Sequence, residues 1–392
     1  MEEKTYYLDN ANTSFLSADV YKKILECYTK CQCDEHSIYA GGRNSQMEIE
    51  LAKKNIAKAI GAEPDEIIFT SGLEESNNWA IKGLAKSNMS KGKHIITSVI
   101  EDSSILDACH ELQEEGFKVT YVPVDENGVV DYAEIIKSIG PDTCLISIGM
   151  ANKEVGSLEP IRAIAELANQ NGVCFHTDAS QAIGAISISA KDLGVDCMSI
   201  SSQVVGGPKG VGAIYLKEGT EIAKMIAGDS KSLRAGNLNV PLIAGFGLAV
   251  KNATTDLDEK VKNVRIVRKY FQKKLSEAVH NIALNGHPIQ RLANNANIMF
   301  EGAESEAVVA LLDKEGICAA SCTGVENGTN SASRVLTAMG KKPEWARSSV
   351  RFTFGSDITK EDVDEIVETI RKVVKKIRSI SAVRIYKNKV EL

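Results

Sequence analysis

Five short polar segments, each directly after a β-rich run, hold most of the side chains that could do chemistry. They are residues 70–76, 98–102, 150–154, 176–181 and 199–205. Asp178 offers a carboxylate for a protonated ring nitrogen. The turn at Ser71 and Gly72, at the start of an expected helix, offers hydroxyl and backbone N–H groups for a phosphate. Together these residue types suit a phosphorylated heterocycle.

The elements that must position these side chains alternate between β-rich runs and stretches of helical length. The runs are 66–70, 94–98, 118–124, 144–150, 173–178, 197–202 and 212–216. Several are apolar at both alternating positions, as strands buried on both faces require. The pattern predicts an α/β fold with a mainly parallel, seven-stranded sheet. Ligands of such sheets bind beyond the carboxyl ends of the strands, where the five polar segments would meet.

The pattern changes after about residue 255. Residues 256–279 form a long, charged, helix-like stretch, and short strand candidates follow at 295–300 and 349–354. A closing helix carries an apolar stripe at three-and-four spacing, formed by Val363, Ile366, Val367, Ile370, Val373, Val374 and Ile377. We therefore predict a large α/β domain over 12–255 and a smaller α+β domain over 1–11 and 256–392.

Composition excludes several classes of protein. The 392 residues are 43% hydrophobic and 25% charged, which is typical of a globular chain, and the net charge of −6 argues against nucleic-acid binding. Apolar stretches such as 242–250 fall far short of the ~20 residues of a membrane span, and residues 1–4 show no signal-peptide pattern. Nine irregularly spaced cysteines favour a reducing cytoplasm. Cys31 and Cys33, like Cys318 and Cys322, lack a matching Cys/His set, so no metal site is predicted.

Motifs along nearly the whole chain match one family, in that family's order. They are 7–9 (YLD), 67–72 (IIFTSG), 92–98 (GKHIITS), 152–156 (NKEVG), 176–181 (HTDASQ), 207–212 (GPKGVG), 234–237 (RAGN) and 348–352 (SSVRF). The sequence thereby resembles the NifS/IscS-type cysteine desulfurases, pyridoxal phosphate (PLP) enzymes of the class V aminotransferase group. The resemblance implies the aspartate-aminotransferase type of fold. It also implies a homodimer with the active site at the subunit interface.

The match breaks at the centre of the family's chemistry. The family's Ser-x-x-His-Lys supplies the lysine that forms a Schiff base with PLP, and the matching stretch here is Ser201-Ser-Gln203-Val204. Valine has no amine, and Lys209 matches a different family lysine that is not expected to reach the cofactor. We therefore expect no bound cofactor.

Four more family positions differ. Asp102 replaces the histidine that stacks on the cofactor ring, Lys153 replaces the asparagine at its phenolic oxygen, and Gln203 replaces the histidine beside the Schiff-base lysine. Glu74 stands in the phosphate cup, where charge repulsion at ~4 Å costs ~4 kcal/mol at an effective dielectric of 20. Residues 71–74 also fit a capping box, with Ser71 as N-cap and the Glu74 carboxylate in place of a phosphate.

Other family residues are retained, and each has a structural alternative. Asp178 and Gln181 match the partners of the ring nitrogen and phenolic oxygen, or Asp178 supports loops as a buried acid. Arg351 matches the arginine that grips the substrate carboxylate, or it forms a salt bridge at the end of a strand. Cys322 matches the sulfur-accepting cysteine, or it is a small packed residue. The other candidates carried over are Asn12 for substrate, and Gly72, Ser201 and Asn237 for cofactor.

Lys153 leaves further alternatives open. It would serve as a displaced Schiff-base amine, or it would form a salt bridge with Asp102, Glu74 or Asp178. Alternatively, the lysine and these three acids together would bind a small cation-bearing ligand. The overall prediction is a desulfurase-like protein with a degenerate PLP site that acts in sulfur transfer or iron–sulfur cluster handling. It would do so by accepting sulfur on Cys322, or by docking a scaffold protein or an active desulfurase. The rivals are an active PLP enzyme with an unrecognised lysine, and a binding or regulatory module without sulfur chemistry.

Overall fold

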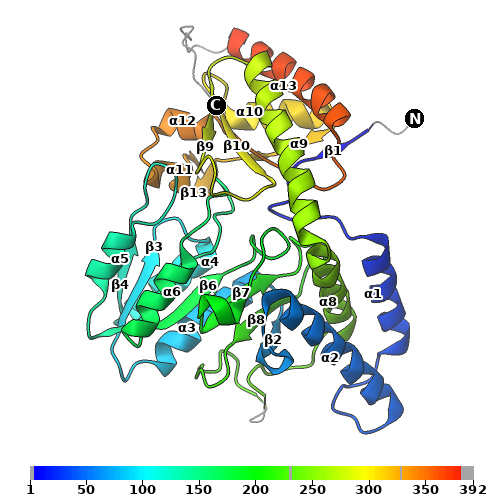
Figure 1. Ribbon diagram of the computed structural model, residues 1–392, viewed down its shortest axis with the longest axis vertical. Coiled ribbons are helices and arrows are strands. Elements are labelled where there is room, and N and C mark those ends of the chain that lie inside the picture. Colours follow the sequence, from blue (N-terminus) through cyan, green and yellow to red (C-terminus); the bar gives the residue numbers. More distant parts are fainter. Residues whose placement is uncertain (1–3, 229–231, 327–328, 381–392) are drawn as a thin grey trace.

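A computed structural model describes residues 4–228, 232–326 and 329–380 (Figure 1). Residues 1–3, on which the signal-peptide prediction partly rests, lie outside the described residues. Within the described ranges, no helix combines the length and the apolar character that crossing a membrane requires.

The large lower part of Figure 1 is built on a seven-stranded sheet. Its order is β2 (Ile67–Thr70), β8 (Gly212–Leu216), β7 (Cys197–Ser201), β6 (Cys174–Asp178), β5 (Thr143–Ser147), β3 (His94–Ser98) and β4 (Lys118–Val122). Neighbours pair in parallel except that β8 is antiparallel to both β2 and β7. Only residues 202–211 connect β7 to β8, which is too short for the crossover that parallel neighbours need. The predicted α/β fold with a mainly parallel sheet is confirmed.

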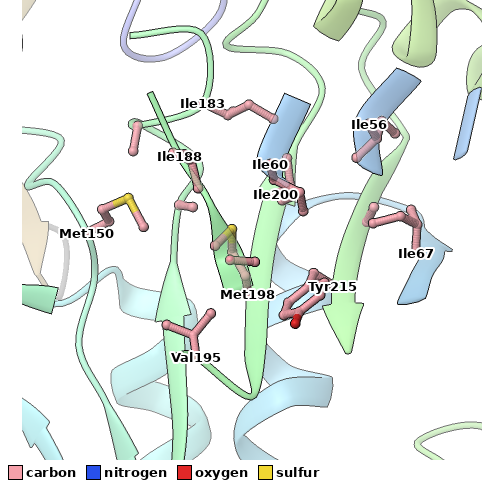
Figure 2. Packing of buried hydrophobic residues seen from close by; sticks show 14 of the residues in the cluster. Ile56, Ile60, Ile67, Met150, Ile183, Ile188, Val195, Met198, Ile200 and Tyr215 are labelled. Carbon is pink, nitrogen blue, oxygen red and sulfur yellow. The ribbon is translucent and has the colours of Figure 1, made fainter. Parts of the chain in front are cut away.

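Helices cover both faces of this sheet, because its strands are apolar on both sides. One face packs against α3 (Leu73–Ser87) and α4 (Ser103–Glu114). The other packs against α2 (Ala40–Ile60), α6 (Ile161–Gln170) and α8 (Val240–Thr254). Figure 2 shows this second core, where Ile56 and Ile60 of α2 lie near Ile200 and Ile67 of the strands. Remaining elements here are α1 (Ala18–Lys30), η1 (Pro64–Glu66), α5 (Tyr132–Ser138) and α7 (Ala190–Leu193).

The upper part of Figure 1 holds an antiparallel sheet of four strands. Its order is β12 (Ala320–Ser321), β15 (Ser349–Thr353), β10 (Asn295–Phe300) and β9 (Ile282–Asn285). α9 (Leu257–Ala278), α10 (Ser305–Lys314) and α13 (Lys360–Ile380) pack around it. The predicted stripe from Val363 to Ile377 is buried along α13.

The N-terminal segment packs with this upper part. β1 (Tyr6–Tyr7) pairs in parallel with β11 (Ile317–Cys318), and the buried Tyr6 and Leu8 belong to the same apolar cluster as α9 and α13. The predicted boundary at residue 255 falls on the C-cap of α8; the division into two domains stays a prediction. The other elements are β13 (Gly324–Glu326), β14 (Thr329–Ser331), α11 (Arg334–Ala338) and α12 (Pro343–Arg347).

Candidate functional site

A cavity of about 510 Å³ lies at the carboxyl ends of the parallel strands, and all five polar segments contribute to its wall. β12, the start of α11 and β15 complete it from the upper part of the molecule. Ten of the candidate residues line it: Asn12, Glu74, Asp102, Lys153, Asp178, Gln181, Ser201, Gln203, Val204 and Arg351. The prediction that the five segments meet is correct.

Val204 follows β7 in a turn and presents a branched hydrocarbon to the cavity. Its carbonyl oxygen accepts a hydrogen bond from the Ser14 hydroxyl at 3.1 Å, which anchors the turn to the N-terminal segment. Beside it, the Gln203 Nε2 donates to the Asn12 carbonyl oxygen at 3.0 Å. Gln181 Nε2 donates in the same way to the carbonyl oxygen of residue 11, also at 3.0 Å. The side-chain amides of Gln181 and Gln203 therefore bind the N-terminal segment to the cavity wall.

Among the described residues that line the cavity, Lys153 is the one lysine. Lys209 is exposed and does not line this cavity. Burial lowers the pKa of Lys153, and the charge of Arg351 lowers it further. Within the described part of the chain no carboxylate lies within 4.0 Å of its Nζ, so the predicted salt bridge with Asp102, Glu74 or Asp178 is wrong. The charges of Asp102, Asp9 and Glu74 act on the amine without direct pairing.

The start of α3 differs from the predicted capping box. Gly72, not Ser71, is the N-cap, and it is Glu75 that turns back to accept the Ser71 N–H at 2.7 Å. Glu75 also forms an ion pair with Arg234 at 2.9 Å. Because Gly72 precedes the helix directly, Glu74 falls at the second helical position and its side chain lines the cavity. Gly72 itself does not line the cavity; a Cβ on it would lie 3.7 Å from Glu74 Oε2.

Asp178 and Asp102 are two acidic residues of the cavity wall. Asp178 is buried at the end of β6, and its two oxygens accept from Asn77 Nδ2 at 2.9 Å and from the Ser180 N–H at 2.8 Å. Burial raises the pKa of Asp178, and the charge of Asp102 raises it further. Asp102 is the N-cap of α4, where its Oδ1 accepts from the Ser104 N–H at 3.0 Å.

Glu101 is a cavity residue that the sequence analysis did not single out, although it lies in one of the five segments. Its oxygens accept from the Ser98 hydroxyl at 2.6 Å and from the Gly149 N–H at 2.9 Å. Burial raises the pKa of Glu101 to about 8. The carboxyl group is therefore largely protonated at neutral pH.

This shift predicts a pH dependence of stability. The folded state holds the Glu101 proton up to about pH 8, whereas the unfolded chain releases it near its ordinary pKa of about 4.3. The free energy of unfolding should therefore fall as pH rises between these values, by at most ~1.4 kcal/mol per pH unit. We expect Glu101→Gln, which mimics the protonated acid, to flatten that decline in urea denaturation at pH 6 and pH 8.5. Glu114→Gln, on an exposed residue of α4, is the control. An unchanged slope in Glu101→Gln would contradict the assignment.

Arg351 forms the ion pair that was its structural alternative, although it lies in the middle of β15 and not at a strand end. Its Nη2 lies 2.7 Å from Asp9 Oδ1, and the second Asp9 oxygen accepts from Asn12 Nδ2 at 2.8 Å. The Arg351 Nε is buried and has no hydrogen-bond partner among the described residues. The guanidinium is thus neutralised by Asp9 while one N–H still lacks an acceptor. Asp9 lies in the matched 7–9 motif, which was the signal that could have found it.

Cys322 does not line the main cavity. It lines a smaller adjoining cavity of about 240 Å³, and Glu154, Arg334 and Arg351 line both. Its thiol is 5% exposed and accepts a hydrogen bond from Asn297 Nδ2 at 3.1 Å. Burial raises the pKa of Cys322 well above its usual value, and the neighbouring Glu154 adds to the rise. In this conformation the residue is packed and protonated.

Asn237 also lies outside the main cavity. It lines a separate cavity of about 770 Å³, whose other residues include Tyr28, Cys31, Cys33 and Asp34. A single chain does not bring Asn237 to the other cofactor candidates, and its assignment to a cofactor site at a subunit interface stays a prediction. The separation could not be predicted from the sequence, because Asn237 belongs to neither a helix nor a strand and lies between β8 and α8.

Comparison with known proteins gives one consistent result. The family model described as aminotransferase class-V matches residues 6–366. A protein named cysteine desulfurase IscS from Methanosarcina thermophila is 42% identical over 97% of this chain and 94% of its own length. Another of that name from Dictyoglomus turgidum is 40% identical over 97% of both chains. A solved structure titled NifS-like protein superposes with a TM-score of 0.89 at 31% identity, over 95% of this chain and all of that one.

Proposed function

Because the chain belongs to the aminotransferase class-V family, among the IscS- and NifS-type cysteine desulfurases, we propose that it is a desulfurase homologue whose PLP site is degenerate. In this proposal the protein does not release sulfur from L-cysteine by PLP chemistry. One observation carries the proposal: Val204 lines the cavity at the position that matches the family's Schiff-base lysine.

The remaining cavity residues also fit PLP poorly. Glu74 projects into the cavity from the first turn of α3, where the family's phosphate cup lies. A phosphate ~4 Å from that carboxylate would be repelled by ~4 kcal/mol per pair of unit charges at an effective dielectric of 20. Asp102 presents no flat ring face at the stacking position, and its oxygen is engaged in capping α4. Asp178 is retained, but one carboxylate does not offset the lost tether and the added repulsion.

The test is covalent trapping. The full-length protein is incubated with PLP and reduced with borohydride, and the lysines are examined by mass spectrometry. We expect no stoichiometric pyridoxyl adduct and no alanine from L-cysteine, while an IscS relative treated in parallel gives both. A stoichiometric adduct on any lysine, together with alanine production, would overturn the proposal.

A second candidate is an active PLP enzyme that uses Lys153. The observation in its favour is that this partly buried lysine lines the cavity and has a lowered pKa, as Schiff-base lysines do. Its position after β5, not after β7, argues against it. An adduct that forms on the native chain and disappears in Lys153→Arg would establish this candidate in place of the first.

For the remaining role, we propose sulfur or iron–sulfur handling through association with a scaffold protein or an active desulfurase. Cys322 is the candidate sulfur acceptor, and its burial in this conformation means that it would have to become exposed first. If Cys322→Ser leaves sulfur transfer between such partners unaltered, Cys322 is not a sulfur acceptor. That result would favour the alternative hypothesis of a binding or regulatory module without sulfur chemistry. All nine cysteines are free, which supports a reducing compartment such as the cytoplasm.

We further propose a homodimer, with the surface around α1 and the start of α2 as its interface. Large apolar side chains are exposed there: Tyr21, Leu25, Tyr28, Ile38, Tyr39, Met47 and Leu51. Seven large apolar side chains exposed on two successive helices and their connection are more than isolated surface residues explain, and they are typical of a protein interface. Asn237 lies beside it, in the cavity that Tyr28 also lines, which fits a residue that serves the second subunit's site.

Charge placed in this interface should split the dimer. We expect light scattering after size exclusion to give a dimeric mass for the native chain and a monomeric mass for Ile38→Asp, because an unpaired buried carboxylate is costly. Ile38 is 91% exposed in the single chain, and Ile289 is 84% exposed on a distant loop. Ile289→Asp is therefore the matched control and should remain dimeric. A native monomer would contradict the proposal.

A further inference from the structure

Two cysteines at the end of α1 and one glutamate of α2 form a cluster apart from the main cavity. The sulfurs of Cys27 and Cys31 and a carboxylate oxygen of Glu48 all lie within 4.8 Å of one another. Cys27 and Cys31 are one helical turn apart, so their side chains share the face of α1 that meets α2. They are 2% and 8% exposed, and Glu48 is partly buried.

A carboxylate and a lysine lie beside the two buried thiols of this cluster. Burial raises the pKa of Cys27 to about 12, and the Glu48 carboxylate raises it further. Burial and then Glu48 likewise raise the pKa of Cys31. The facing cation is Lys23, whose Nζ lies 2.7 Å from the Glu48 carboxylate. Lys30 and Glu26 also act on the cluster at longer range.

We propose that Cys27, Cys31 and Glu48 bind a thiophilic divalent cation of the zinc class. Thiolates and carboxylates are both zinc ligands, and a water molecule would fill the fourth, tetrahedral position beside these three protein ligands. Binding replaces the two thiol protons, which leave to solvent, and involves no change of oxidation state. Two sulfurs on a tetrahedral zinc lie ~3.8 Å apart at zinc–sulfur distances of ~2.3 Å. Small side-chain rotations therefore suffice to close the site from its present separations.

The fold provides a route to the site and a consequence of filling it. Cys31 also lines the open cavity of about 770 Å³, through which an ion and its water ligand can enter. α1 and α2 each pack on α8, and the Lys23–Glu48 ion pair joins them directly. A bound ion would add a second direct link between the two helices. The connection between them carries the exposed Ile38 and Tyr39. The cation would thus fix the segment 31–39, which carries Ile38 and Tyr39 of the proposed interface.

Cobalt(II) is the spectroscopic probe for this site. We expect the reduced, full-length protein to give thiolate-to-cobalt charge-transfer absorption and tetrahedral ligand-field bands at one equivalent, and Zn²⁺ to abolish both. Cys27→Ser and Cys31→Ser should remove the charge-transfer signal, and Glu48→Gln should weaken binding at least about tenfold. Cys33→Ser is the matched control, because that cysteine is two residues from Cys31 and outside the cluster. It should bind as the native chain does.

A second measurement uses the native chain alone, in case a cysteine variant does not fold. Zn²⁺ should slow alkylation of Cys27 and Cys31 while leaving Cys33 unaffected, and it should raise the melting temperature by several degrees. Absence of charge-transfer absorption, or its persistence in both cysteine variants, would overturn the proposal. So would equal protection of Cys33 in the alkylation experiment. None of these readouts depends on whether the protein binds PLP.

Discussion

The double variant Val204→Lys/Glu74→Thr is expected to attach PLP covalently, whereas the native chain does not. The lysine restores an amine at the cavity wall where Val204 now lies. The threonine removes the Glu74 carboxylate from the first turn of α3, so that the helix N-terminus becomes free to hold a phosphate. Removing a repulsion of ~4 kcal/mol corresponds to a gain of about 10³ in affinity. After borohydride reduction, mass spectrometry should show close to one pyridoxyl group per double-variant chain.

The single variants separate the two contributions. Glu74→Thr alone should bind PLP without a covalent adduct, and Val204→Lys alone should form the adduct only at much higher PLP concentration. Adding Lys153→Arg to the double variant should leave the adduct in place, on residue 204. An adduct found on Lys153 instead would contradict the role given to residue 204. So would a double variant that folds normally but takes up no PLP.

The second large effect concerns the thiol of Cys322, which should react with iodoacetamide at least about 100-fold more slowly than that of Cys33 in the folded protein. Cys322 is 5% exposed, and burial raises its pKa well above the usual value, so very little thiolate is present at neutral pH. Each unit of pKa rise lowers the thiolate fraction tenfold. Cys33 is partly exposed and lines an open cavity.

Differential alkylation followed by peptide mass spectrometry measures both rates in one sample. In urea the two rates should become similar, which controls for differences in peptide recovery. A native rate for Cys322 close to that of Cys33 would mean that the segment around residue 322 opens readily. That outcome would contradict the packed state described here and favour a sulfur relay through Cys322.

The strands of the large sheet could be predicted closely from the sequence. Residues 94–98, 197–202 and 212–216 were expected and were found within one residue, because each run is apolar on both faces and bounded by turn residues. Strand direction was less accessible. The antiparallel course of β8 follows from the short connection after β7, which a pattern of apolar residues does not reveal.

The residues that line the cavity could be predicted from the sequence, but the hydrogen-bond partners of their side chains could not. The rule that loops converge at the carboxyl ends of parallel strands brings Glu74, Asp102 and Asp178 together. The partners of these side chains depend on contacts distant in sequence, such as Asn77 on Asp178. The capping box failed because Gly72 shifts the start of α3 by one residue, which exchanges the roles of Glu74 and Glu75.

The cluster on α1 and α2 could not have been inferred from cysteine spacing. In the sequence Cys31 and Cys33 are the closest pair, two residues apart. The helix instead places Cys27 and Cys31 on one face. The third group, Glu48, comes from a different helix. Spacing becomes informative only once the helical register is known.

The Asp9–Arg351 ion pair has a consequence for ligand selectivity. An incoming molecule with an acid group would have to displace Asp9 from Arg351 Nη2, which lies 2.7 Å from Asp9 Oδ1, because the Nε that lacks an acceptor is buried. Its net gain would be reduced by the loss of that contact. Neutral and cationic molecules face no such competition. A fragment screen of this chamber should therefore be enriched in amides and amines and depleted in carboxylic acids.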